Sequence, residues 1–157
     1  AMVGAGQRAD ELAGAYENNI DSSLVRAADF TRRPKVYFEE WDNPQISGIC
    51  WVSELIEIAG GDDIFPELAV CPDGKSRIIA DPDEVVRRAP DIIIGSWCGK
   101  KFRPEKVAAR QGWDAIPAVQ NGDIYEIKSA EILQPGPAAL TDGLEQLQEI
   151  IANWAHG

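Results

Sequence analysis

The sequence predicts an α/β protein in which a mostly parallel sheet lies between two layers of helices. Segments of helical and of strand character alternate along the 157 residues, which is the pattern of such folds. The run Asp91–Gly95 is apolar after its first residue, as in a parallel strand that is buried on both faces. A chain of this length buries roughly 68–70% of its unfolded surface, so it needs no disulfide or metal to fold. We therefore expect a Rossmann-like three-layer sandwich, preceded by a long N-terminal helix.

The N-terminal segment is expected to form that helix. Apolar residues recur every four positions and continue into two alanines, a spacing typical of one face of a helix. Pro34 ends the segment, because proline disfavours the helical conformation in the residue before it. A helix of about 25 residues is roughly 37 Å long, more than a small domain needs. The apolar stripe consists of Leu12, Tyr16, Ile20, Leu24, Ala27 and Ala28.

The next segments predict one strand–helix unit. Residues 35–41 (K-V-Y-F-E-E-W) are rich in β-formers and mostly apolar, and they predict a buried strand. Residues 42–45 read as a loop. Residues 48–59 carry apolar side chains at helical spacing, and the pair Gly60-Gly61 ends the predicted helix.

Two further elements follow a loop that is rich in proline and aspartate. We expect a short strand at residues 77–79. A helix is expected to start with Asp81 as N-cap and Pro82 at the first helical position, and to end before Pro90. The buried strand at 91–95 comes next.

The C-terminal part predicts a short helix, two strands and a closing helix. The short helix covers residues 104–110. Strands at 118–119 and 124–127 flank Asn121-Gly122, which favours a tight turn. The closing helix opens at Pro137.

Charge and composition exclude several partners. The chain holds 15 basic and 26 acidic residues, for a net charge of −11. Nucleic acids and anionic lipid surfaces attract positive patches, so neither is an expected partner. No apolar run approaches the ~20 residues of a membrane span. The first residues also lack the basic start and apolar stretch of a secretory signal, so we expect no signal peptide in this chain.

Little in the sequence predicts catalysis. His156 is the single histidine, so Ser–His and Cys–His arrangements lack their ordinary base. No phosphate-binding loop or dinucleotide fingerprint is present. The acidic pairs Glu39-Glu40 and Asp62-Asp63 could hold a hard cation, but we expect solvated charges at the surface or at strand ends. An enzyme using Cys98 or these pairs is the least favoured hypothesis.

Binding is better supported. In open α/β sheets, ligands bind outside the carboxyl ends of the strands. Residues 41–50, 96–99 and 129–134 are expected there, and three of the five tryptophans fall in or next to these segments. Large aromatic side chains suit flat, partly apolar ligands, although each tryptophan could instead pack in the core. The tryptophans are Trp41, Trp51 and Trp97.

Cysteines fall on the same predicted end of the sheet. The three cysteines, Cys50, Cys71 and Cys98, are an odd number and follow no zinc spacing. Cys50 and Cys98 could form a disulfide only if their α-carbons lie within about 7 Å, and free thiols remain the alternative.

Four segments in series resemble a known family. They are the strand K-V-Y-F-E-E-W at 35–41, the stretch E-L-I-E-I-A-G-G-D-D-I-F at 54–65, the unit D-P-D-E-V-V-R-R-A-P-D-I-I-I-G at 81–95, and G-W-D-A-I-P-A-V-Q-N-G-D-I-Y-E-I at 112–127, followed by P-G-P. In this order they resemble the C-terminal lobe of the cobalamin and iron-siderophore substrate-binding proteins of ABC importers. That family joins two α/β lobes by one long helix and holds its ligand between them.

The resemblance implies a domain organisation and a role. Residues 1–33 would be the connecting helix and residues 34–157 the C-terminal lobe, with the N-terminal lobe absent. The protein would capture a metal chelate such as cobalamin or a ferric siderophore and deliver it to an ABC permease, with no catalysis and no cofactor of its own. In its full-length form it would be periplasmic, or extracellular and membrane-associated. With one histidine and no tyrosine cluster, a ligand that carries its own metal fits better than direct coordination.

The resemblance also places the ligand contacts on the loops after the matching strands. These positions are Trp41, Trp51, Trp97, Cys98, Glu131, Ile132 and Leu133. An alternative remains open: an intracellular sensing or interaction domain that reuses the same lobe, possibly as a homodimer whose contact is the apolar stripe of the first helix.

Overall fold

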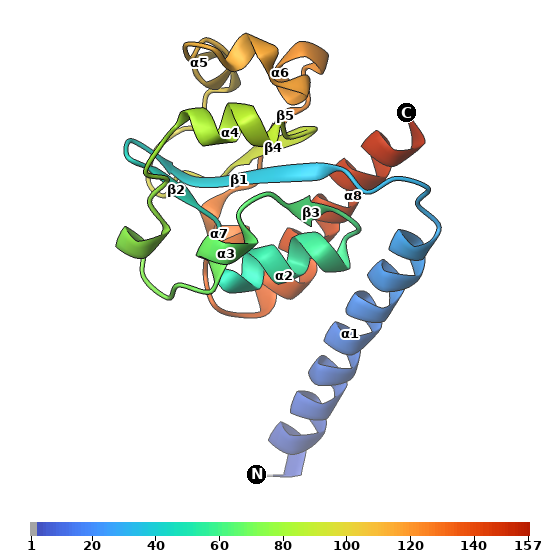
Figure 1. Ribbon diagram of the computed structural model, residues 1–157. Coiled ribbons are helices and arrows are strands. Elements are labelled where there is room, and N and C mark those ends of the chain that lie inside the picture. The colour runs from blue at the N-terminus through green and yellow to red at the C-terminus, as the bar shows by residue number, and fades with distance from the viewer. Residues whose placement is uncertain (1–2) are drawn as a thin grey trace.

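The computed structural model describes residues 3–157 and has the predicted α/β architecture (Figure 1). Its helices and strands follow one another in this order: α1 (Val3–Ala28), β1 (Lys35–Asp42), β2 (Gln45–Ser47), α2 (Cys50–Ile58), β3 (Asp62–Asp63), α3 (Pro66–Ala69), α4 (Asp83–Arg88), β4 (Ile92–Gly95), α5 (Pro104–Ala108), α6 (Pro117–Asn121), β5 (Ile124–Glu126), α7 (Ser129–Ile132) and α8 (Leu144–His156). A short π-helix, Ala139–Gly143, leads into α8.

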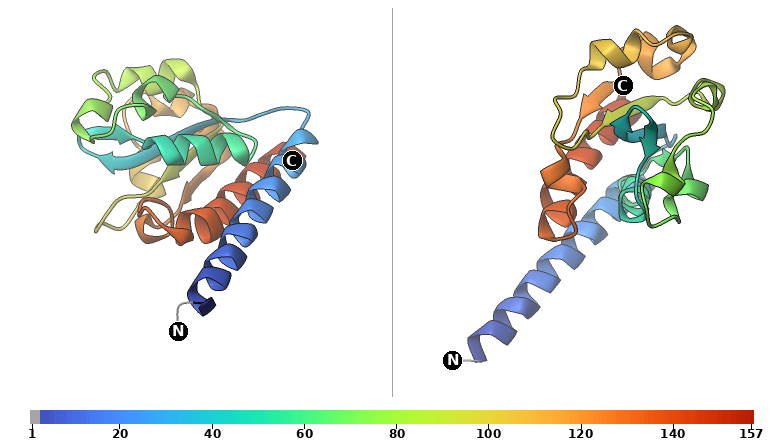
Figure 2. Two further views of the ribbon diagram at one scale, coloured as in Figure 1. Left: turned by 90° about the horizontal axis from the view of Figure 1, so that it is seen from below. Right: turned by 90° about the vertical axis from the view of Figure 1, so that its left-hand side faces the viewer.

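One mixed sheet forms the middle layer. Strands run in the order β2-β1-β4-β5, and β3 pairs with the same side of β1 as β2 does. The pairs β1–β3, β1–β4 and β4–β5 are parallel, while β2 is antiparallel to β1. The helices α2, α7 and α8 cover one face, and α4, α5 and α6 cover the other (Figure 1). The right-hand view of Figure 2 shows the same layers from another side.

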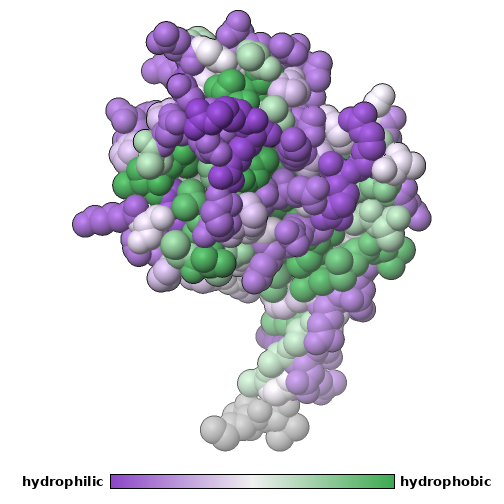
Figure 3. Space-filling model, in the orientation of Figure 1, coloured by the Kyte–Doolittle hydropathy of each residue, from purple (hydrophilic) through white to green (hydrophobic). Residues whose placement is uncertain are grey.

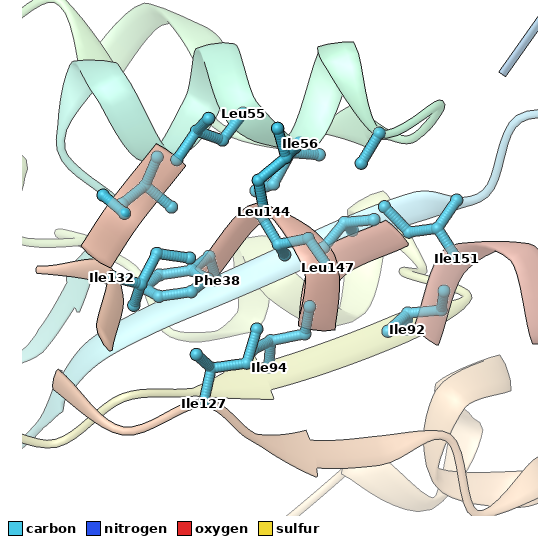
Figure 4. Close-up of a cluster of buried hydrophobic side chains, with 14 residues drawn as sticks. Phe38, Leu55, Ile56, Ile92, Ile94, Ile127, Ile132, Leu144, Leu147 and Ile151 are labelled. Atoms are coloured by element: carbon cyan, nitrogen blue, oxygen red, sulfur yellow. The ribbon is translucent and has the colours of Figure 1, made fainter. Parts of the chain in front are cut away.

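Each face of the sheet has its own hydrophobic core, because alternate residues of a strand point to opposite faces. Phe38 and Ile94 point to the α2–α8 face and pack against Leu147 (Figure 4). Tyr37 and Ile93 point to the other face, where α4, α5 and α6 pack. All four strand residues are 0–1% exposed, which explains why strands β1 and β4 read as nearly continuous apolar runs.

Helix α1 extends well beyond the body formed by the rest of the chain (Figures 1 and 2). Its C-terminal half packs on the α2–α8 layer through Ile20, Ser23 and Ala27. The predicted stripe is therefore shifted, since Leu12 and Leu24 are 51% and 47% exposed. Figure 3 shows hydrophobic surface where this helix meets the body and a mixed surface along its outer part. The helix ends at Ala28, and residues 1–2 of the predicted helix lie outside the described residues.

The prediction of two short strands, at 77–79 and 118–119, is wrong. Residues 75–77 form a single 3-10 turn, closed by Asp73, whose carboxylate accepts hydrogen bonds from the backbone N–H and the hydroxyl of Ser76. Of the predicted strand at 77–79, Ile78 makes one isolated bridge to Ile46.

The predicted strand at 118–119 lies inside helix α6. Pro117 occupies its first turn, a position where the fixed φ of proline favours helix. Gly122, with φ of 77°, is the left-handed C-cap of this helix rather than part of a hairpin turn. The local Asn-Gly signal was correct for a left-handed residue, but it could not distinguish a helix end from a hairpin. No helix in residues 3–157 combines the length and apolar character that a membrane span requires.

Candidate functional site at the carboxyl end of the sheet

The order of the strands defines the candidate site. From β1 the chain passes through α2 to β3 on one side of β1, and then to β4 on the other side. The connections that follow β1 and β4 therefore diverge, which is the topological position where open α/β sheets bind ligands. Residues 39–42 and 95–98 lie at this position. It faces the viewer in the right-hand view of Figure 2.

Glu39, near the end of β1, is the polar centre of this region. Its side chain is fully buried and accepts four hydrogen bonds. The Tyr37 hydroxyl donates over 2.8 Å and the Trp97 Nε1 over 3.0 Å. Arg110, which follows α5, donates from both terminal nitrogens, over 2.7 and 2.9 Å. One carboxylate thus links β1, the loop after β4 and the segment after α5.

The protonation states of the partners fit this network. Burial raises the pKa of Tyr37 well above its ordinary value of 10.0, and the nearby Glu39 carboxylate raises it further, so the hydroxyl remains a donor. Burial alone would lower the pKa of Arg110, but its hydrogen bonds and charge interaction with Glu39 outweigh burial and raise it. The Arg110 guanidinium also lies 4.5 Å from the ring centre of Trp113.

Lys100 connects two of the predicted tryptophans. Its Nζ lies 5.5 Å from the ring centre of Trp41 and 5.0 Å from that of Trp97, within the range of cation–π attraction. The same nitrogen pairs with Asp42 over 2.5 Å. The structure therefore brings Trp41 and Trp97 together, with a cation between the end of β1 and the loop after β4.

The residues at this position differ in exposure. Trp41 is partly exposed, and its Nε1 donates to the Asn43 carbonyl over 3.0 Å. Trp97 is 5% exposed and packs edge-on against Phe102, with ring centres 4.8 Å apart. Cys98 is exposed. Trp41 and Cys98 are thus accessible to a ligand. Trp97 lies beneath them in the hydrophobic core on the α4–α6 face of the sheet, called the second core below.

The other predicted residues form a separate group around α7. The Nε1 of Trp51, at the start of α2, donates to the Ile132 carbonyl over 2.9 Å. Trp51 and Leu133 are partly exposed, while the side chain of Ile132 is fully buried in the core and has no surface for a ligand. Glu131 accepts a hydrogen bond from Gln146 of α8 over 2.9 Å.

The acidic pair Glu39-Glu40 was expected to be solvated, and this expectation is wrong. Glu39 is buried, and Glu40 pairs with Arg77 over 2.9 Å and accepts the backbone N–H of Ile49 over 2.8 Å. Glu39 is buried and Glu40 is partly buried, and arginines and N–H donors satisfy both carboxylates.

The two residues of the second acidic pair, Asp62 and Asp63, differ in burial. Asp62 is exposed and pairs with Arg33 over 2.8 Å. Asp63 is partly buried, and burial raises the pKa of its carboxyl above the ordinary value of 3.8. Among residues 3–157, no group of three or more His, Cys, Asp or Glu side chains could hold a metal ion.

The cysteines at this end of the sheet are free thiols. Cys50 lines a groove of about 180 Å³ between α2 and α3, together with Ser53 and Val70. Cys98 lies in the loop after β4. The alternative of free thiols, which the sequence left open beside a disulfide, is the one that the structure has.

Sequence reasoning missed Lys100, Asp42, Arg110 and the central role of Glu39. One signal for Glu39 was available, because it interrupts the apolar part of a strand that was expected to be buried. A carboxylate at such a position requires buried partners. Arg110 gave no comparable signal, since its contact with Glu39 depends on how α5 folds back over the sheet.

The sequence of the chain matches a family model. Residues 1–131 match the model of the periplasmic binding proteins. No protein of curated function matches the chain in sequence.

Solved structures share the fold. The chain matches a possible iron-binding, periplasmic solute-binding protein from Staphylococcus epidermidis with a TM-score of 0.75 and 23% identity, over 92% of this chain and 55% of that one. It matches the periplasmic vitamin B12-binding protein of Vibrio cholerae with a TM-score of 0.68 and 19% identity, over 97% of this chain and 55% of that one. It matches a protein of the ABC-type Fe3+-hydroxamate transport system of Saccharomonospora viridis with a TM-score of 0.71 and 20% identity, over 92% of this chain and 49% of that one.

The chain thus spans about half the length of these solved structures. The family model covers more than half of the chain, and the solved structures share its fold. The chain belongs to the periplasmic binding protein family.

Proposed function

We propose that this chain is the C-terminal lobe of the substrate-binding component of an ABC importer, and that its ligand is a metal chelate such as cobalamin or a ferric siderophore. The observation that carries the proposal is the group of Trp41, Trp97 and Lys100 at the point where the connections of β1 and β4 diverge. Ligands of open α/β sheets bind at this position. Membership of the periplasmic binding protein family supports the same role.

In the proposed site, the partly exposed residues contact the ligand and the buried ones support them. Trp41, Trp51, Cys98 and Leu133 have surface to offer. Trp97 supports Trp41 from the core through Lys100, and Glu131 is held by Gln146. We leave Ile132 out of the contact set, because its side chain is fully buried.

The long helix supports a two-lobed organisation. Between residues 4 and 19 of α1, every residue except Gly14 and Tyr16 is exposed, so this half of the helix has almost no packing partner in the lobe. We propose that a second lobe packs along this half and closes over the carboxyl end of the sheet. The ligand would then lie between the lobes, and the assembly would deliver it to a membrane permease from the periplasmic or extracellular side.

Tryptophan fluorescence tests the ligand class. The full-length natural polypeptide is titrated with cyanocobalamin and with ferric siderophores, and we expect saturable quenching by one of them, since Trp41 and Trp51 are partly exposed. The Trp41→Ala variant should bind that ligand more weakly and lose only about 1 kcal/mol of stability. If none of these chelates quenches the full-length polypeptide, the metal-chelate assignment is wrong.

A second candidate rests on the exposed apolar residues of α1. Leu12, Leu24 and Val25 are 51%, 47% and 68% exposed. In an isolated lobe, this face could join two copies of the chain, as in a sensing or interaction domain. The molar mass of the full-length polypeptide at micromolar concentration distinguishes the two: the importer component is a monomer, and a dimer that Leu24→Ser dissociates would favour the second candidate.

A further inference from the structure

Positive charge is concentrated at one place in a strongly acidic chain. Of the 15 Lys and Arg residues, five lie between residues 100 and 110, and Glu105 is the only acid among these residues. This segment begins in the loop after β4, next to the point where the connections of β1 and β4 diverge. The segment that begins beside the proposed ligand site thus carries a net positive charge, in a chain whose net charge is −11.

Two of these cations are already neutralised by the protein. Arg110 is paired with the buried Glu39, and Lys100 is paired with Asp42 while it lies between Trp41 and Trp97. Their charges are used to hold the region together, and they leave little attraction for a ligand.

Lys101 and Arg103 differ from this pair. Both side chains are exposed. The nearest acid to Arg103 is its neighbour Glu105, at 3.7 Å, a long contact between exposed groups. Among the ion pairs of the described residues, none involves Lys101. Exposed pairs of this kind contribute little, so both cations are available to another anion.

The residue between them fixes their position. Phe102 is 2% exposed, and its ring lies against the backbone of Gly95 at the end of β4 and against the Trp97 ring. A β-carbon on Gly95 would lie 1.8 Å from the Phe102 ring, so glycine is required for this close approach. Phe102 therefore anchors in the second core the segment that carries Lys101 and Arg103.

We propose that the ligand is an anionic metal chelate, with carboxylate or phenolate groups facing Lys101 and Arg103 and its flat apolar part facing Trp41. This inference rests on the proposed function and narrows its ligand class. Cations at the rim of a site attract an anion over about 10 Å at 0.1 M salt, and they reject a cationic chelate. Closure of a second lobe would remove water from these contacts and strengthen them.

Charge-matched titrations test the proposal. The full-length natural polypeptide is titrated by tryptophan fluorescence with an anionic ferric tris-catecholate, with a neutral ferric trihydroxamate and with neutral cyanocobalamin. The test variant is Lys101→Gln/Arg103→Gln. The matched control, Lys35→Gln/Arg87→Gln, removes the same charge from the start of β1 and from the C-terminal end of α4, where both residues are exposed. Circular dichroism verifies that both variants fold.

We expect the catecholate to bind best, with an affinity that falls as salt is added. The test variant should bind it at least about tenfold more weakly, and the control should match the parent. Preferred binding of a neutral chelate, or equal catecholate affinity in the test variant and the parent, overturns the inference and leaves the proposed function standing. Binding of none of the three overturns the proposed function and this inference with it.

A last arm excludes a lipid contact. The same proteins are sedimented with vesicles that contain phosphatidylglycerol. We expect no vesicle binding that depends on Lys101 and Arg103. Vesicle binding that the test variant loses, together with unchanged catecholate affinity, would assign the segment to a membrane surface and overturn the inference.

Discussion

Arg110 donates hydrogen bonds from two nitrogens to the carboxylate of Glu39, over 2.7 and 2.9 Å, although the two residues are 71 positions apart in the chain. The pair joins the end of β1 to the segment after α5. It is buried on the carboxylate side, where the side chain of Glu39 is 1% exposed, against 20% for Arg110. This relationship ties together the two parts of the chain that flank the candidate site.

Removal of one partner from this pair should be strongly destabilising. Arg110→Ala leaves the Glu39 carboxylate buried without its main counter-charge, and breaking a buried pair in this way costs about 3–5 kcal/mol. The free energy of unfolding, measured in urea, gives the value. The matched control is Arg87→Ala, which breaks exposed pairs to Asp81 and Glu84 and should change stability little. Equal losses in the two variants would contradict the assigned role of the buried pair.

Substitution of Gly95 should disturb the second core. Gly95→Ala places a methyl group 1.8 Å from the Phe102 ring, so the ring must move, and overpacking of this kind costs about 1–3 kcal/mol or more. Gly14→Ala is the control, because a β-carbon there meets nothing within 4 Å and alanine is the better helix former. Thermal unfolding should show a lower midpoint for the first variant only. An unchanged midpoint for Gly95→Ala would contradict the close contact.

Asp63 should make stability fall as pH rises in the acid range. Burial raises the pKa of its carboxyl in the folded state above 3.8, so the folded state binds the proton more tightly than the unfolded state does. Its contribution is therefore fully present below the unfolded pKa and is lost as pH rises through the folded pKa. Asp63→Asn keeps an oxygen acceptor for the Phe65 N–H, which Asp63 accepts over 3.0 Å. This variant should gain stability relative to the parent as pH rises above about 4, and then keep a constant difference.

Urea titrations of both proteins at a series of pH values check this prediction. A difference between parent and variant that does not change with pH would show that Asp63 titrates alike in the folded and unfolded states.

Substitution of Trp97 should cost much more stability than substitution of Trp41, which we assign to ligand binding. Trp97→Ala removes a buried ring and the N–H that Glu39 accepts, and such truncations cost about 3–5 kcal/mol. The Nε1 of Trp41 bonds only to Asn43, two residues away, and its ring is partly exposed, so Trp41→Ala should cost about 1 kcal/mol. Unfolding in urea measures both values, and the reverse order would contradict the assignment of Trp97 to the core.

The sequence could predict the elements whose patterns are local. Strands β1 and β4 are covered on both faces, so their apolar runs identify them without any knowledge of their neighbours. The long first helix follows from the spacing of its apolar residues. The boundary between helix and strand at 118–119 could not be predicted in this way, because Val119 suits both and Pro117 decides in favour of helix.

The candidate site was predictable in its place but not in its contacts. The carboxyl ends of β1 and β4 follow from the fold class, and Trp41 and Trp97 were expected there. Which tryptophan is exposed depends on Phe102 and on the Glu39 carboxylate, and both act across the sheet from other segments. Such long-range partners have no local signature in the sequence.

The pairing of β1 also bears on self-association. Its outer side is covered by two separate pieces, with β3 against Lys35 and Val36 and β2 against residues 39–42, where a bulge interrupts the register. At the opposite side of the sheet, β5 is only three residues long. Long, flat outer strands recruit strands from other molecules, and here each outer strand has only two or three residues. The sheet thus offers little template for strand addition, which favours solubility during folding.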